Sequence, residues 1–136
     1  ENLMLEQDDY SQEIMKNLGV EPTPGDEYGR INFNSPEQAK MAKQKLIGLA
    51  LNKLNKLQAN GLITAKGHEE IKKVFQKGTL MPSDDDLKFH QDDAVGHYLN
   101  KGNQEMSSKV SAAFKDLKSF LSAAARIERK MVSRAS

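Results

Sequence analysis

The chain contains no cysteine and no tryptophan, only four prolines, and aromatic residues at 6% of its 136 positions. Without cysteine it can form neither disulfides nor thiolate metal sites. That absence is compatible with a reducing compartment, and we expect a cytoplasmic protein. No apolar run approaches the roughly 20 residues that a membrane-spanning helix needs, and the start lacks the pattern of a signal peptide.

Catalytic and cofactor motifs are also missing. The sequence has no Gly-x-Ser-x-Gly elbow, no Gly-x-Gly-x-x-Gly fingerprint and no phosphate loop ending in Gly-Lys-Ser/Thr. Adjacent carboxylates such as Asp92 and Asp93 point to different faces of a helix and cannot act as an acid–base pair. We therefore expect no enzyme activity, no cofactor and no small-molecule substrate.

One group of side chains resembles a metal site. Asp86, His90, Asp93 and His97 are spaced by four, three and four residues, which places them on one helical face. Carboxylate and imidazole groups suit zinc or another divalent ion. However, four ligands spread over three turns of one helix cannot converge on one ion. We therefore interpret them as a solvated polar face and predict no metal site.

The apolar spacing predicts an all-α fold, an irregular bundle of about five helices with a long C-terminal helix. We expect helices over residues 3–18, 36–60, 64–78, 83–102 and 104–133. Prolines and glycines exclude a helix from residues 20–34, which are predicted to be a loop. In this loop Ile31 and Phe33 alternate with polar neighbours, so they either anchor the loop to the core or form a short extended piece.

The second predicted helix has the clearest signals at both ends. Ser35 is the expected N-cap, Pro36 takes the first helical position, and Gln38 completes a capping box. Gly61 is the expected C-cap. Because the middle of this helix is apolar nearly all round, we expect it to be the central helix, with neighbours on every side.

The last predicted helix carries a heptad seam of apolar side chains. If it runs from Gln104 to Ser133, it is about 45 Å long and extends beyond its neighbours. Its last turns, at Ile127, Met131 and Val132, would then either contact another chain or fray in solvent. The seam consists of Met106, Val110, Ala113, Leu117, Phe120, Ala124, Ile127 and Met131.

The net charge of +1 hides a segregation of charge along the chain. Residues 1–35 carry −6, residues 36–78 carry +6, residues 79–104 carry −3 and residues 105–136 carry +4. The two basic blocks are candidates for contacts with nucleic-acid phosphates. The candidate residues are Lys40, Lys43, Lys45, Lys53, Lys56, Arg126, Arg129, Lys130 and Arg134.

These features favour a non-enzymatic helical protein-interaction or assembly module. Its expected partner is another protein or a second copy of the chain, and the alternative is a nucleic-acid-binding helical domain. A membrane surface is disfavoured as a partner, because the apolar seam of the last helix is more simply a bundle core. Residues 1–136 fit one domain, and the start at Glu1 rather than Met suggests an excised domain or a processed product of a larger protein.

Overall fold

The computed structural model describes the backbone of residues 2–133 and the side chains of residues 10–133. It confirms the predicted all-α class, with five helices and two short strands in the described part of the chain. In order they are α1 (Asn2–Leu18), β1 (Ile31–Phe33), α2 (Pro36–Ala59), α3 (Ala65–Gln76), α4 (Asp84–Leu99), α5 (Gln104–Lys130) and β2 (Met131–Ser133). None of the described helices is both long enough and apolar enough to cross a membrane.

Ser35 is the N-cap of α2 and Pro36 its first residue, as predicted. The Ser35 hydroxyl accepts a hydrogen bond from the backbone N–H of Gln38 at 3.2 Å. The Gln38 side chain in turn accepts from the backbone N–H of Asn34, one residue before the cap. The first bond satisfies one N–H group that the first turn of a helix leaves without a partner, and the second ties the residue before the N-cap to the helix.

The C-terminus of α2 ends in the turn that a glycine makes possible. Gly61 has φ +72°, and Leu62 donates its N–H to the carbonyl of Leu57 at 2.8 Å. The same kind of hydrogen bond, from the residue after a glycine to the carbonyl five residues earlier, closes α1 at Gly19, α3 at Gly78 and α4 at Gly102. Short glycine-capped turns therefore set the antiparallel path of the chain from α2 to α5.

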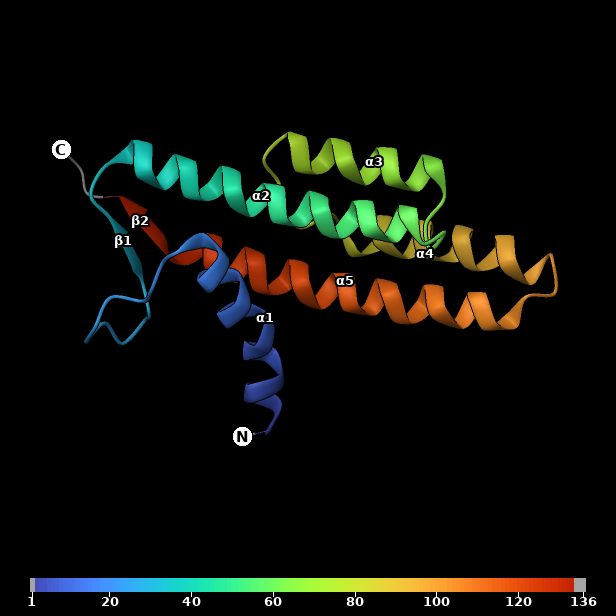
Figure 1. Cartoon of the computed structure of the whole chain (residues 1–136), viewed down its shortest axis with the longest axis horizontal. Helices are drawn as coiled ribbons and strands as arrows, with labels where there is room; N and C mark the ends of the chain where they lie inside the picture. Colours follow the sequence, from blue (N-terminus) through green and yellow to red (C-terminus); the bar gives the residue numbers. More distant parts are fainter. Residues whose placement is uncertain (1, 134–136) are drawn as a thin grey trace.

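The helices form an elongated bundle around α2 and α5 (Figure 1). These two long helices pack side by side, α3 lies against α2, α4 lies against α5, and α1 crosses α5 (Figure 1). Because α2 contacts α1, α3, α5 and both strands, its predicted central position is confirmed. The fully buried side chains of the bundle include Leu46, Leu54, Phe75, Leu117 and Leu121.

The two strands correct the predicted end of the last helix, and one of them forms the extended piece that was one alternative for Ile31 and Phe33. Ile31–Phe33, inside the predicted loop, pairs in parallel with Met131–Ser133, where a continuing helix was predicted. The last helix ends at Lys130. Met131 still donates its N–H to the carbonyl of Glu128, but its backbone is already extended, and Met131–Ser133 pair with β1. Ile31 and Phe33 are both buried, so they anchor this segment to the core as well as forming an extended piece.

Burial along α4 and α5 confirms one prediction and contradicts another. Every position of the predicted heptad seam is buried or half-buried, with Met131 at the start of β2 and the other seven positions in α5. On α4, however, His90 is only 6% exposed, so the predicted solvated face of four polar side chains is wrong at that position. His90 lies against the first turn of α3, where Gly67 has no side chain to exclude the imidazole.

Candidate functional site

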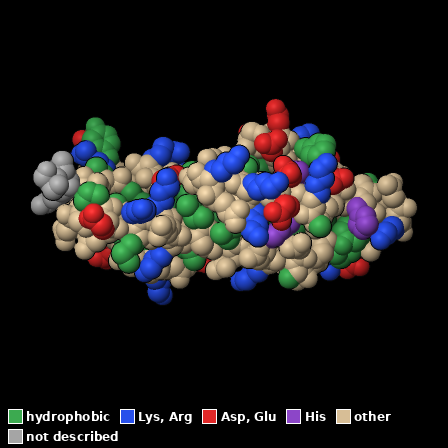
Figure 2. Space-filling view, turned by 90° about the horizontal axis from the view of Figure 1, so that it is seen from above, with side chains coloured by type: hydrophobic (Ala, Val, Ile, Leu, Met, Phe, Trp, Pro, Cys, Tyr) green, Lys and Arg blue, Asp and Glu red, His purple; other side chains and the backbone are tan. Residues whose placement is uncertain are grey.

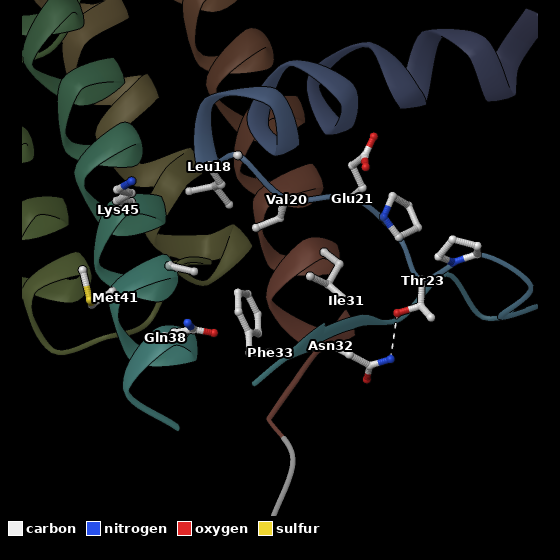
Figure 3. A pocket seen from close by; sticks show the side chains of 14 residues that line it. Leu18, Val20, Glu21, Thr23, Ile31, Asn32, Phe33, Gln38, Met41 and Lys45 are labelled. Carbon is white, nitrogen blue, oxygen red and sulfur yellow. Dashed lines mark hydrogen bonds between the residues drawn. The ribbon is translucent and has the colours of Figure 1, made fainter. Parts of the chain in front are cut away.

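A groove of about 540 Å³ lies beside β1. Its walls are the end of α1, the loop that follows, β1 and the first turns of α2 (Figure 3). We call it the β1 groove, and it is lined by Leu18, Gly19, Val20, Glu21, Pro22, Thr23, Pro24, Ile31, Asn32, Phe33, Gln38, Met41, Ala42 and Lys45.

The β1 groove has an apolar floor and a mixed rim. Leu18, Ile31 and Phe33 are buried at its base, and Val20 is half-buried beside them (Figure 3). On the rim Met41 is 61% exposed, which is unusual for a long apolar side chain. An exposed methionine beside apolar groups is typical of adaptable binding surfaces.

The loop that forms one wall of the groove is held by hydrogen bonds. Thr23 donates its backbone N–H to the carbonyl of Arg30 at 2.8 Å, and its hydroxyl accepts from the Asn32 amide at 2.7 Å (Figure 3). Farther out, Asp26 forms an ion pair with Arg30 at 3.0 Å. The groove is therefore a formed feature of the fold, with its wall fixed to β1.

The second notable feature is the direction of α1. Its C-terminal half packs on the bundle through Ile14 and Leu18, whereas its N-terminal half, residues 2–9, extends away from the bundle (Figure 1). The point of departure is fixed by three side chains, Tyr10, Lys53 and Asp116, which we call the Tyr10 cluster. They join α1, α2 and α5.

Hydrogen bonds connect all three members of the Tyr10 cluster. The Tyr10 hydroxyl donates to Asp116 and accepts from Lys53 at 3.0 Å, and Lys53 forms an ion pair with Asp116 at 2.9 Å. The Tyr10 ring meets the ring of Phe120 edge to face, with 5.3 Å between centroids. The ammonium of Lys53 lies 4.8 Å from the centroid of the Tyr10 ring, a favourable cation–π distance.

The surroundings shift the pKa of each group in the cluster. Burial raises the pKa of Tyr10, and the hydrogen bond to the Asp116 carboxylate adds to the rise. Burial opposes the charged forms of Lys53 and Asp116. Hydrogen bonds with Tyr10 and with each other outweigh it, so the pKa of Lys53 is raised and that of Asp116 is lowered. A protonated lysine and an ionised aspartate suit a structural ion pair.

The structure places the predicted protein-contact residues of the C-terminus differently from expectation. Ile127 is 2% exposed and belongs to the core, and Met131 packs against that core at the start of β2. Only Val132, at 39% exposure, offers apolar surface. The residues that follow α5 are covered by the same chain, because β2 continues from the helix, pairs with β1 and contacts α2.

The predicted phosphate-contact residues fall into separate groups. Lys43 bonds to Glu128 at 3.0 Å and Lys53 belongs to the Tyr10 cluster, so both hold α2 against α5. Arg126 is half-buried, and Arg134 lies outside the described residues. Acidic side chains lie among the basic ones on the face seen in Figure 2. The exposed candidates are Lys40, Lys45, Lys56, Arg129 and Lys130.

His90 is the one described side chain with a buried polar atom that has no hydrogen-bond partner, at Nδ1. In the described part of the chain, no three His, Asp or Glu side chains come together as a group that could hold a metal ion. His97, which the sequence places on the same face, is exposed. The imidazole of His90 is therefore a packing group between α4 and α3 in this fold.

Comparisons of the chain with protein-family models, with curated proteins and with solved structures found no match. The interpretation of the site therefore depends on the groove, the course of α1 and the distribution of charge.

Proposed function

We propose that the protein is a self-associating helical interaction module, in which the β1 groove of one copy receives the N-terminal half of α1 from another. The observation that carries this proposal is that one chain presents both an open groove with an apolar floor and a helical segment that leaves its own bundle. A short helix without tertiary contacts is only marginally stable in water. The backbone of residues 2–9 leaves the bundle (Figure 1), so a surface that covers this short segment would stabilise it.

The chemistry of the segment matches that of the groove. Residues 1–9 contain three consecutive apolar residues, Leu3, Met4 and Leu5, together with four acids and no base. The floor of the β1 groove is apolar, and Lys45 lies on its rim. Lys40 is exposed farther toward the start of the same helix. An acidic segment with three adjacent apolar residues is thus complementary to this wall in composition and charge.

The positions of the segment and the groove on the chain also suit a two-fold dimer. The segment lies at one end of α1, and Leu18 and Gly19 bring the groove to the other end. Two antiparallel copies of α1, each about 25 Å long, would place each segment at the partner's groove. The contact would then form twice, which helps a small surface reach the roughly 1,000 Å² that a specific interface needs.

Sedimentation of the purified chain over a range of concentrations tests the proposal. The parent chain should show a concentration-dependent dimer. Met41→Glu puts a negative charge on the rim opposite an acidic segment and should shift the protein to monomer. Phe89→Glu is the matched control, because Phe89 is an equally exposed apolar side chain, at 59%, on α4.

The control variant should remain dimeric, and far-ultraviolet circular dichroism should show that both variants keep their helical content. A parent chain that is monomeric at every soluble concentration would contradict the proposal. So would equal loss of the dimer in the two variants.

A further inference from the structure

The sulfur atoms of this chain all belong to methionine, because it has six methionines and no cysteine. Five of the six have described side chains. Met15, Met81, Met106 and Met131 are half-buried, and all of these except Met106 pack against the core. Met41, in contrast, is 61% exposed. An oxidant in solution therefore reaches the sulfur of Met41 more readily than that of the other four.

Met41 also stands at a sensitive place, the rim of the β1 groove (Figure 3). Gln38 lies three residues earlier on α2 and Lys45 four residues later, so the three side chains share one face of the helix. All three line the groove. In the proposed dimer the acidic segment of the partner copy would cover Met41 and face Lys45. The state of this one sulfur atom thus bears on both the apolar and the charged part of the contact.

We propose that Met41 is a redox modification site, at which a hydroperoxide converts the thioether to a sulfoxide and so releases a partner docked in the β1 groove. The release rests on the proposed self-association, whereas the modification does not. With hydrogen peroxide, the sulfur donates an electron pair to one oxygen and the O–O bond breaks. The other oxygen leaves as hydroxide and takes up the proton of the first, which forms water. Sulfur is oxidised by two electrons and the peroxide is reduced by two.

The sulfoxide changes the rim of the groove in two ways. It replaces an apolar group with a polar one, whose oxygen loses its hydrogen bonds to water when a partner covers it. The same oxygen is an acceptor one helical turn from Lys45, so it competes with the carboxylates of the segment for this ammonium group. We expect the dissociation constant of the dimer to rise about tenfold. Docking covers the sulfur in turn, so the dimer should be oxidised more slowly than the free chain.

Partial oxidation of the full chain by hydrogen peroxide, followed by separation of monomer from dimer, tests this proposal. The chain is oxidised while dilute, quenched, concentrated and re-equilibrated, and the two gel-filtration fractions are digested after glutamate. Each of the six methionines then lies in a peptide of its own. Mass spectrometry should detect the Met41 sulfoxide before those of the four half-buried methionines. Its ratio of monomer to dimer should be about ten times that of the unoxidised chain.

Reduction by methionine sulfoxide reductases and a thiol should return the oxidised monomer to the dimer. The matched control is Phe89→Met, which adds a thioether outside the β1 groove at a position that is 59% exposed on α4. The added sulfur should be oxidised about as fast as that of Met41, and its sulfoxide should divide between the fractions as the unoxidised chain does. Far-ultraviolet circular dichroism should show that the oxidised chain keeps its helices.

Three results would overturn the proposal. They are slower oxidation of Met41 than of a half-buried methionine, a Met41 sulfoxide that stays in the dimer, and enrichment of the Met4 sulfoxide alone in the monomer. A chain without any dimer fraction would overturn the proposed self-association and with it the release. A dimer that retains the Met41 sulfoxide contradicts the present inference alone, so the two failures are distinguishable.

Discussion

Removal of one hydroxyl group from the Tyr10 cluster should loosen α1. Tyr10→Phe deletes two hydrogen bonds, one to each charged partner, and leaves the Lys53–Asp116 ion pair at 2.9 Å and the ring contact with Phe120 in place. Hydrogen bonds to charged groups contribute about 1.5–3 kcal/mol when they are buried. The Asp116 side chain is 47% exposed, so water replaces part of what is lost. We therefore expect a cost of about 1 kcal/mol.

The measurement is urea unfolding followed by far-ultraviolet circular dichroism. It is best made in the Met41→Glu background, because dimerisation would otherwise make the apparent stability depend on concentration. A loss of about 1 kcal/mol corresponds to a fall in Tm of about 3–5 °C for a chain of this size. A double-mutant cycle with Asp116→Asn should show a coupling of about 0.5–1 kcal/mol.

The control for this prediction is Tyr28→Phe, since Tyr28 is 67% exposed and lies outside the core. It should leave the free energy of unfolding unchanged. If Tyr10→Phe also stays within about 0.3 kcal/mol of its parent, the Tyr10 cluster does not hold α1 on the bundle.

Three further outcomes follow from the same contacts. Gly61→Ala should destabilise the chain by about 1–2 kcal/mol in thermal unfolding. The reason is that φ is +72° at this position and that an added Cβ would lie 2.9 Å from the Tyr98 hydroxyl oxygen. An unchanged stability would contradict this prediction. His90→Leu should leave stability unchanged or raise it by about 1 kcal/mol, because it removes a buried nitrogen without a partner; a marked loss would reveal a bond to that nitrogen. The stabilisation from the Tyr10 cluster should be full between about pH 4 and pH 10. It should fall in acid, as the carboxylate with the lowered pKa is protonated, and in alkali, as the tyrosine and lysine with raised pKa values lose their protons. If the difference in the free energy of unfolding between the parent chain and Tyr10→Phe stays constant from pH 2 to pH 12, this assignment is refuted.

Helix boundaries were predictable from the sequence because their causes are local. A cap such as Ser35 bonds to an N–H three residues away, and a glycine such as Gly61 closes its own helix within one turn. The heptad seam of α5 was likewise visible in a single segment. These signals predicted the ends of all five helices to within three residues.

The strand pair was not predictable, since it joins residues 100 positions apart. The alternation of Ile31 and Phe33 indicated an extended piece, but nothing local identifies Met131 as the partner of Ile31. Parallel pairing also needs the whole bundle to bring the two segments together. The predicted projection of the last helix was wrong for this reason.

The candidate sites were only partly accessible from the sequence. Lys43 and Lys53 belong to a basic block, yet each meets an acid of α5 that is far away in the chain. The β1 groove is built from three separate segments, so composition could not reveal it. The burial of His90 had one sequence signal, Gly67, whose meaning depends on how α3 meets α4.

The most direct test of the proposed self-association uses the absence of cysteine. Chains with a single cysteine at Leu3, Met4 or Leu5 are each mixed with a chain carrying Met41→Cys and are oxidised gently. A disulfide needs Cα atoms about 4.4–6.8 Å apart. We predict a cross-linked heterodimer for at least one of the three mixtures, and none when Phe89→Cys replaces Met41→Cys. No cross-link in any mixture, or equal cross-linking to position 89, would contradict docking of α1 in the β1 groove.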